Sequence, residues 1–163
     1  MKNTAKRTAI TGMLGALALV LQLAEGLIPP LPGLPPGAKP GLSNIVTMFC
    51  ADFVGFPYAM GVSLIKGTFA IMTRGVTAGC MSLAGGIFST ATAWILLKKT
   101  KLSFMTVGMI CAFMHNLGQF FVAMYITGVG VIYYIPGMLI VGLVSGALTG
   151  MLFGMGERRI KNY

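Results

Sequence analysis

The chain has 163 residues, of which 56% are hydrophobic and only 9% are charged, and its formal net charge is +9. About a quarter of the residues of a soluble domain are charged. This chain therefore cannot cover a water-facing surface, and an integral membrane protein is the class that fits. Its basic residues form short clusters at the ends of apolar segments instead of lining one face, which argues against nucleic-acid binding.

Six apolar segments are predicted to be helices, because a helix needs roughly 20 residues to span a bilayer. Their approximate bounds are residues 8–28, 42–56, 58–73, 76–97, 104–126 and 131–155. The second and third are short, and each contains a charged residue. The N-terminal stretch resembles a signal peptide, but its apolar run is long and lacks a small-residue cleavage site, so we interpret it as a retained first helix. We expect one membrane domain over residues 1–163.

The basic clusters predict the topology, because Lys and Arg favour the cytoplasmic side of short loops. The clusters lie before the first segment, after the fourth and after the sixth: Lys2, Lys6 and Arg7; Lys98, Lys99 and Lys101; Arg158, Arg159 and Lys161. Six crossings put all three clusters on one side, whereas five or seven would put the last one outside. The predicted fold class is therefore an all-α integral membrane protein with six transmembrane helices and cytoplasmic N- and C-termini.

A proline-rich loop, residues 29–41, connects the first two segments. It contains six of the eight prolines of the chain. Proline fixes φ and lacks an N–H, so the loop is expected to be stiff and irregular. Irregular backbone near a bilayer is tolerated at the surface, or where it is buried in protein or lines a cavity. The topology puts this loop outside, where we expect it to close over a small-molecule site.

The fifth segment contains the polar run HNLGQ. His115 and Gln119 are four residues apart and share a helix face, and Asn116 and Cys111 are close to that face. A lone intramembrane histidine is usually a satisfied core residue. Here the amide of Asn116 is adjacent and the amide of Gln119 lies one turn further on. Together they provide more hydrogen-bonding groups than packing needs, which favours a ligand-facing site.

Charged residues within the spans are further candidates, because each costs about 2.5–3.5 kcal/mol at mid-bilayer. Asp52 and Lys66 lie on adjacent short helices, where they either pair with each other or reach toward a membrane surface. Glu25 is expected at the outer end of the first segment. With Lys39, Lys66 and Arg74 it makes the outer half charged but mostly basic, which suits an anionic or strongly polar ligand group.

The residues predict neither a metal site nor an enzyme. One histidine, no nearby carboxylate and three isolated cysteines cannot supply three or four metal ligands, and the cysteines are interpreted as buried small hydrophobes. The chain lacks the GxxxxGK[ST] phosphate loop. Asp52 is its only aspartate, so the aspartate-rich motifs of prenyl synthases are also absent. We expect no cofactor, and any uphill transport needs a partner or an ion gradient.

Small residues at four-residue spacing let helices approach closely in lipid. The sixth segment carries Gly142, Gly146, Gly150 and Gly154. The fourth carries Ser82, Gly86 and Thr90. Packing within the chain is the favoured interpretation for both. The first carries Thr8, Gly12 and Ala16, flanked by Ala5 and Ala9. This stripe reaches the cytoplasmic end, so internal packing and docking of another membrane protein both stay open.

Three motifs, in this order on six predicted helices, resemble the Gx transporter family. They are GAKPGLSNIVT (residues 37–47), SLAGGIFS (82–89) and HNLGQ (115–119). Members of that family are often labelled heptaprenyl diphosphate synthase component I, and the resemblance covers residues from about 8 to 156. The family is in turn similar to the substrate-binding S components of energy-coupling factor (ECF) transporters. Those proteins have six helices, a first-loop lid over an outward site, and a small-residue stripe on helix one that docks a coupling subunit.

The resemblance implies a non-catalytic S component of a bacterial cytoplasmic membrane. It would take up a vitamin-like or prenyl/quinone-related molecule with an ECF transmembrane coupling subunit and its ATPases. The candidate ligand residues are Lys39, Ser43, Asn44, His115, Asn116 and Gln119, with Glu25, Lys66 and Arg74 secondary. The candidate docking residues are Ala5, Thr8, Ala9, Gly12 and Ala16. The alternative is a non-catalytic subunit of a prenyl-diphosphate/quinone synthesis or flavin-based electron-transfer system.

Overall fold

The computed structural model describes residues 4–29 and 33–161, and all regular structure in these ranges is helical, as predicted. In chain order the elements are α1 (Thr4–Leu27), α2 (Asn44–Phe49), the π-helical turn η1 (Cys50–Val54), α3 (Phe56–Arg74), α4 (Val76–Lys99), α5 (Phe104–Thr127), the 3-10 turn η2 (Val129–Tyr134) and α6 (Ile135–Lys161). Among the described residues, four helical runs are long and apolar enough to cross a membrane: Thr4–Leu27, Val76–Lys99, Phe104–Thr127 and Val129–Ile160.

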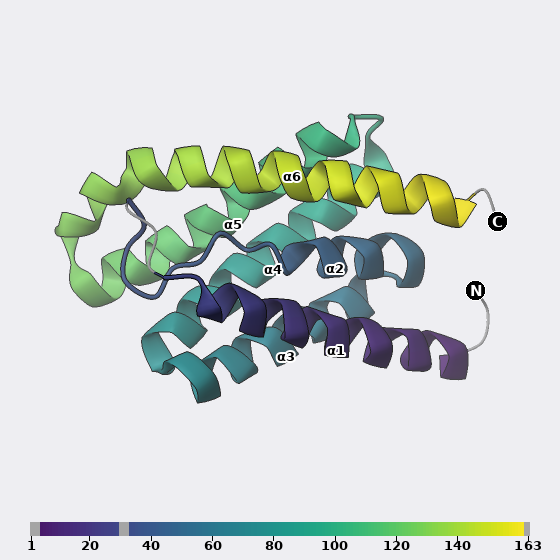
Figure 1. Ribbon diagram of the computed structural model, residues 1–163, viewed down its shortest axis with the longest axis horizontal. Coiled ribbons are helices and arrows are strands. Elements are labelled where there is room, and N and C mark those ends of the chain that lie inside the picture. The colour runs from purple at the N-terminus through teal and green to yellow at the C-terminus, as the bar shows by residue number, and fades with distance from the viewer. Residues whose placement is uncertain (1–3, 30–32, 162–163) are drawn as a thin grey trace.

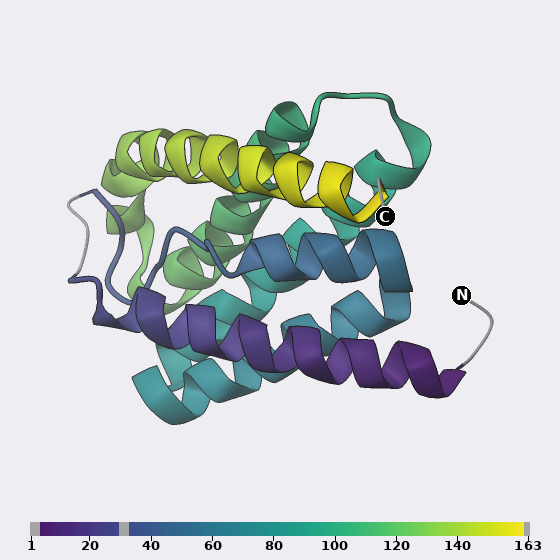
Figure 2. The ribbon, with the colours of Figure 1, turned by 45° about the vertical axis from the view of Figure 1, so that its right-hand side comes forward.

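The helices lie roughly along one long axis, with α1 beginning and α6 ending at the same end of the molecule (Figure 1). At the opposite end the backbone turns after α1, and residues 33–43 run back into the molecule. As a result α2 begins near the middle of the bundle (Figures 1 and 2). We call residues 33–43 the inserted segment. Leu34, Ala38 and Ser43 within it are buried, so its irregular backbone lies inside protein, where such backbone is tolerated at membrane depth.

The helix after the inserted segment is short. The run Asn44–Val54 has six residues in α2 and five in η1. Eleven helical residues rise about 16 Å, roughly half of a hydrocarbon core about 30 Å thick. By length, this run is therefore too short to cross a membrane on its own.

Glycine and proline define the ends of the neighbouring helices. Gly55 has a φ of +128° and ends η1, a conformation that other residues rarely adopt. Pro57 lies in the first turn of α3, where its missing N–H costs nothing. Gly75, with a φ of +89°, separates α3 from α4. At the start of α5 the Ser103 side chain accepts a hydrogen bond from the Thr106 N–H at 3.2 Å, which caps that helix.

The glycine stripe of α6 packs within the chain, as the sequence predicts, and its partner is α5. A Cβ atom added at Gly146 would lie 2.7 Å from the Cα of Met109, and one added at Gly150 would lie 2.8 Å from the Cα of Met105. Gly108 meets the same contact from α5, where an added Cβ would lie 2.6 Å from the Cα of Gly150. The two backbones therefore touch, which is the close approach that small residues allow between membrane helices.

Substitution of Gly150 by valine is expected to lower the free energy of unfolding by about 1–3 kcal/mol, the usual effect of overpacking. Thermal unfolding in detergent micelles measures the change. Gly61→Val is the matched control, because an added Cβ at this helical glycine has no atom within 4 Å. If both variants lose the same free energy of unfolding, the loss comes from the low helix propensity of valine, and the packing contact is contradicted.

Small residues of α4 face two neighbours. Toward α3, the Oγ1 of Thr90 lies 2.6 Å from the Oγ of Ser63, and an added Cβ at Gly86 would lie 3.5 Å from that same Oγ. Toward α5, an added Cβ at Gly85 would lie 2.8 Å from the Nδ1 of His115. The small residues of α4 thus bring the ring of His115 directly against the α4 backbone.

The sequence left open an ion pair between Asp52 and Lys66, and that pairing is wrong. Lys98 Nζ lies 2.9 Å from Asp52 Oδ1 and donates a second bond to the Asp52 carbonyl at 2.8 Å. Lys66 Nζ instead donates to Asn44 Oδ1 at 2.7 Å. The chain reverses at Gly55, so Lys66, eleven residues after the turn, comes level with Asn44, eleven residues before it. Asp52 stays near the turn.

The outer faces of the helices are apolar. Val20 on α1, Phe121 on α5 and Val144 on α6 are among many large hydrophobic side chains that are more than half exposed. Soluble monomers rarely expose such extensive apolar surface. These faces are suited to contact with lipid.

Candidate ligand-binding site

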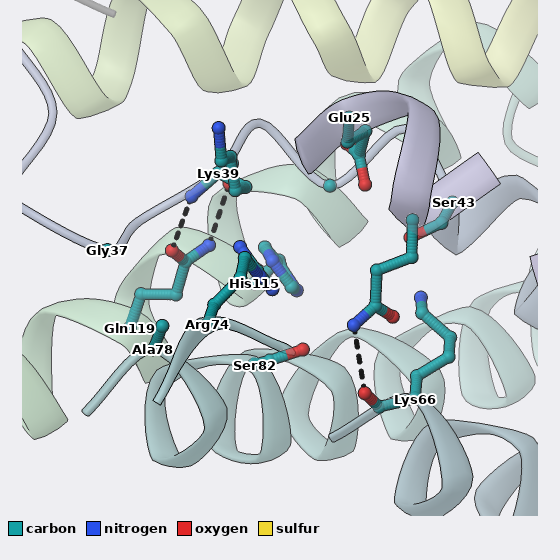
Figure 3. A pocket seen from close by; sticks show the side chains of 12 residues that line it. Glu25, Gly37, Lys39, Ser43, Lys66, Arg74, Ala78, Ser82, His115 and Gln119 are labelled. Atoms are coloured by element: carbon teal, nitrogen blue, oxygen red, sulfur yellow. Dashed lines mark hydrogen bonds between the residues drawn. The ribbon is translucent and has the colours of Figure 1, made fainter. Parts of the chain in front are cut away.

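A small cavity lies where the inserted segment meets α1, α3, α4 and α5 (Figure 3). Its volume is about 20 Å³, enough for about one water molecule. The lining residues are Gln22, Glu25, Gly37, Lys39, Gly41, Ser43, Lys66, Arg74, Ala78, Ser82, His115 and Gln119. Most of these side chains are polar, and in this conformation they close the cavity to any organic ligand.

Gln119 of α5 holds the inserted segment from one side. The Lys39 N–H donates to Gln119 Oε1 at 3.1 Å, and Gln119 Nε2 donates to the Lys39 carbonyl at 3.0 Å (Figure 3). The Lys39 ammonium donates to the Ile28 carbonyl at 2.7 Å. Buried backbone groups need hydrogen-bond partners. The side-chain amide of Gln119 supplies an acceptor for the N–H and a donor for the carbonyl of Lys39.

Two further helices hold the inserted segment in the same way. The carboxylate of Glu25 on α1, which is only 4% exposed, accepts a hydrogen bond from the Leu42 N–H. The hydroxyl of Ser145 on α6 donates to the Pro40 carbonyl at 3.2 Å. Side chains from α1, α5 and α6 therefore bind the backbone of the segment at Lys39, Pro40 and Leu42.

Gly41 marks the closest approach of the inserted segment to the helices. Its φ is +80°, and an added Cβ would lie 2.7 Å from Asn44 Nδ2 and 3.0 Å from the Cδ2 of His115. Both the conformation and the space exclude a side chain at this position. The backbone of the segment thus lies directly against the His115 ring.

Lys66 is the most deeply buried cation of the site, with 4% of its surface exposed. Its ammonium has three N–H donors, and one of them bonds to Asn44 Oδ1 at 2.7 Å. The Gln22 side chain on α1 donates to the Lys66 carbonyl at 2.9 Å. Within residues 4–29 and 33–161 no ion pair to Lys66 is found.

Other polar atoms around the cavity also lack partners. In the described part of the chain, Gln22 Oε1 and Arg74 Nε are buried without a hydrogen-bond partner. Figure 3 shows the Arg74 side chain extending beside His115. The cavity is therefore a partly unsatisfied, cation-rich environment.

Seven of the nine predicted ligand residues line the cavity: Glu25, Lys39, Ser43, Lys66, Arg74, His115 and Gln119. Asn44 is not among the lining residues, but its side-chain oxygen accepts a hydrogen bond from the Lys66 ammonium. Asn116 lies elsewhere, because neighbouring residues on a helix point about 100° apart. Its Nδ2 donates to the Met138 carbonyl at 2.6 Å, and it lines an apolar groove between α5 and α6.

Two polar lining residues were missed from the sequence, Gln22 and Ser82. Gln22 precedes Glu25 by three residues, a spacing that puts both on one helix face and was the available signal. Ser82 was assigned from the sequence to a packing stripe and to the SLAGGIFS motif, but not to the ligand residues. Among the described residues, no three His, Cys, Asp or Glu side chains gather as a group that could hold a metal ion.

The fold is that of a known class of membrane protein. The S component of a bacterial ECF transporter is similar in structure, with a TM-score of 0.76 over 98% of each chain at 19% sequence identity. At that identity the likeness shows the fold. The chain is thus a multi-pass membrane protein with an S-component fold, in agreement with the predicted location in a bacterial cytoplasmic membrane.

The sequence identifies the family. The family model described as heptaprenyl diphosphate synthase component I matches residues 14–155, so the chain belongs to that family. No curated protein matches the sequence. The resemblance inferred from the three sequence motifs is confirmed.

Proposed function

We propose that the chain is the substrate-binding component of an ECF-type transporter. It binds a small molecule from the side of the proline-rich loop and delivers it with an ATP-driven partner module. The supporting observation is the cavity, where an inserted segment and four helices enclose polar side chains within an S-component fold. We propose no catalytic role, although the family name includes a synthase, since the sole aspartate, Asp52, is paired with Lys98.

The proposed topology has six crossings and cytoplasmic termini. The inserted segment and the run Asn44–Val54 together form the second crossing, and α3 forms the third. Both ends of the described chain lie at one end of the molecule (Figure 1), which supports an even number of crossings. The inserted segment then enters from the outer side.

Substrate uptake requires the inserted segment to move. Ligand pockets commonly measure about 300–1,000 Å³, whereas this cavity holds about 20 Å³. Opening breaks the hydrogen bonds that Gln119 and Glu25 make to the segment. Its prolines keep the segment stiff, so reclosing over a substrate loses little conformational entropy.

The docking surface is proposed on α1. Ala5, Thr8, Ala9, Gly12 and Ala16 are all exposed, unlike the stripes of α4 and α6. Thr8, Gly12 and Ala16 line a groove of about 430 Å³ that Tyr58 and Ile65 of α3 border on the other side. A groove of small residues suits close approach of a partner helix within the membrane.

Gly12→Leu is expected to abolish association with the coupling transmembrane subunit while substrate binding stays unchanged. An added Cβ at Gly12 has no atom within 4 Å, so the leucine side chain starts in open space in the isolated chain and is expected to obstruct a docked helix. Co-purification with the coupling subunit measures association. Gly26→Leu is the control, because Gly26 has equally open space on the same helix outside the stripe. Full association of Gly12→Leu would refute this docking surface.

The alternative function, a non-catalytic subunit of a prenyl-diphosphate/quinone synthesis or flavin-based electron-transfer system, keeps one supporting observation. The groove between α5 and α6 measures about 230 Å³ and is walled mainly by apolar residues, including Phe113, Leu117 and Phe120. Such a wall suits an isoprenoid chain. Co-purification with prenyl-synthesis or redox enzymes, without coupling subunits, would favour this alternative.

A further inference from the structure

We infer that the substrate is a small polar anion whose carboxylate or phosphate oxygens are bound by Lys66 and Arg74. This inference rests on the proposed function, because it names the substrate class for the same cavity. It depends on three features of the cavity: its charge, its unpartnered donors and acceptors, and the chemistry of its walls.

The charge of the cavity favours an anion. Three cationic side chains, Lys39, Lys66 and Arg74, face one carboxylate, Glu25, which leaves an excess of two positive charges. Lys66 is 4% exposed and Glu25 is 4% exposed, so water screens these charges poorly. Buried charges are costly unless they are paired and hydrogen-bonded. A bound anion would supply the missing negative charge.

The unpartnered atoms define what the substrate must offer. Lys66 Nζ has one hydrogen bond, to Asn44, and Arg74 Nε has none within the described residues. Both are donors, and carboxylate or phosphate oxygens are strong acceptors for them. Gln22 Oε1 is an acceptor without a partner in the same part of the chain. The substrate therefore combines anionic oxygens with a donor such as a hydroxyl group.

The cavity walls favour a small polar substrate over a large aromatic or isoprenoid one. The twelve lining residues include no Phe, Tyr or Trp and no Leu, Ile, Val or Met. Ring-shaped ligands are commonly held by aromatic and hydrophobic walls, and an isoprenoid chain needs an apolar surface. The lining instead consists of charged, amide, hydroxyl and imidazole groups with two glycines and one alanine.

Substitution of Glu25 tests the inference, because the direction of the change in anion affinity can be predicted. Its carboxylate holds the inserted segment through the Leu42 N–H and also repels an anion in the cavity. Glutamine keeps the carbonyl oxygen that accepts this hydrogen bond and removes the charge. Glu25→Gln is therefore expected to tighten anion binding by about tenfold, the effect of one partly desolvated charge interaction. Lys66→Gln is expected to weaken it by at least about tenfold for the same reason.

The test measures the thermal unfolding midpoint of the full chain in detergent micelles, at constant ionic strength, because a ligand that binds the folded state raises the midpoint. The anionic probes are malate and glycerol 3-phosphate, which separate a carboxylate from a phosphate source. The uncharged counterparts are malamide and glycerol. Asp52→Asn is the control variant, since it removes a carboxylate outside the cavity. Arg74→Gln replaces Lys66→Gln if the latter fails to fold.

The expected result is a stabilisation by one anion but not by its uncharged counterpart. That stabilisation increases in Glu25→Gln, disappears in Lys66→Gln or Arg74→Gln, and is unchanged in Asp52→Asn. Stabilisation by neither anion, or equal stabilisation by an uncharged counterpart, would overturn the inference. The experiment needs no coupling subunit, so its failure leaves the docking test of Gly12→Leu unaffected, and a failed docking test leaves anion binding standing.

Discussion

Substitution of Gly41 by valine is expected to abolish substrate binding and to lower the free energy of unfolding by about 2–6 kcal/mol. Backbone strain at its φ of +80° accounts for about 1–3 kcal/mol. Contact with Asn44 and His115, 2.7 and 3.0 Å from the added Cβ, accounts for a similar amount. Valine would force the inserted segment away from α5. Thermal unfolding measures the loss of stability, and equilibrium dialysis with the proposed anionic substrate measures the loss of binding.

The variant Gly128→Val separates the effect of backbone strain from the effect of steric contact. Gly128 has a φ of +82°, but an added Cβ there has no atom within 4 Å. This variant is expected to lose only the stability that strain removes and to bind substrate normally. If Gly41→Val also binds substrate normally, the segment does not form the site as described.

A disulfide between the inserted segment and α4 is expected to stop substrate exchange completely. The Cβ of Gly37→Cys would lie 3.4 Å from the Cβ of residue 78, close to the spacing of about 3.5–4.5 Å that disulfides need. Gly37 has a φ of +88°, so the cysteine there is expected to cost about 1–3 kcal/mol of stability in both redox forms. The double variant Gly37→Cys/Ala78→Cys is made with Cys80→Ser, because Cys80 is the nearby half-buried native thiol. When it is oxidised, the closed cavity of about 20 Å³ cannot open.

The reduced form of the same protein is the control, because it carries the same substitutions with the segment free to move. Equilibrium dialysis is expected to show binding after reduction and none in the oxidised form. Oxidised protein that takes up the anion as readily as reduced protein would mean that the substrate reaches the cavity by another route.

Much of the fold could be predicted because the signals are local. Hydropathy identified six helical segments, and the spacing of Gly146 and Gly150 predicted that the sixth packs within the chain, which its contact with α5 confirms. The four-residue spacing of His115 and Gln119 correctly put both on one face, where they line the same cavity. In each case the information lies within one helix, where periodicity fixes direction.

The remainder depends on how distant segments meet. Proline content predicted a stiff loop but not that residues 33–43 turn inward, since that course is fixed by partners such as Gln119 and Ser145 far along the chain. Asp52 pairs with Lys98 and not with Lys66. The chain reversal at Gly55 brings Lys66 beside Asn44 instead. Asn116 was predicted to line the site but does not, because it is one residue from His115 and therefore points about 100° away from it.

The central claim is that the cavity beneath the inserted segment is the substrate site of a transport protein. Native mass spectrometry of gently purified wild-type chain and of Lys66→Gln tests it most directly. The wild-type protein is expected to carry a small anionic molecule, and the variant is expected to carry none. Equal occupancy in the two proteins, or no bound molecule in either, would contradict the claim.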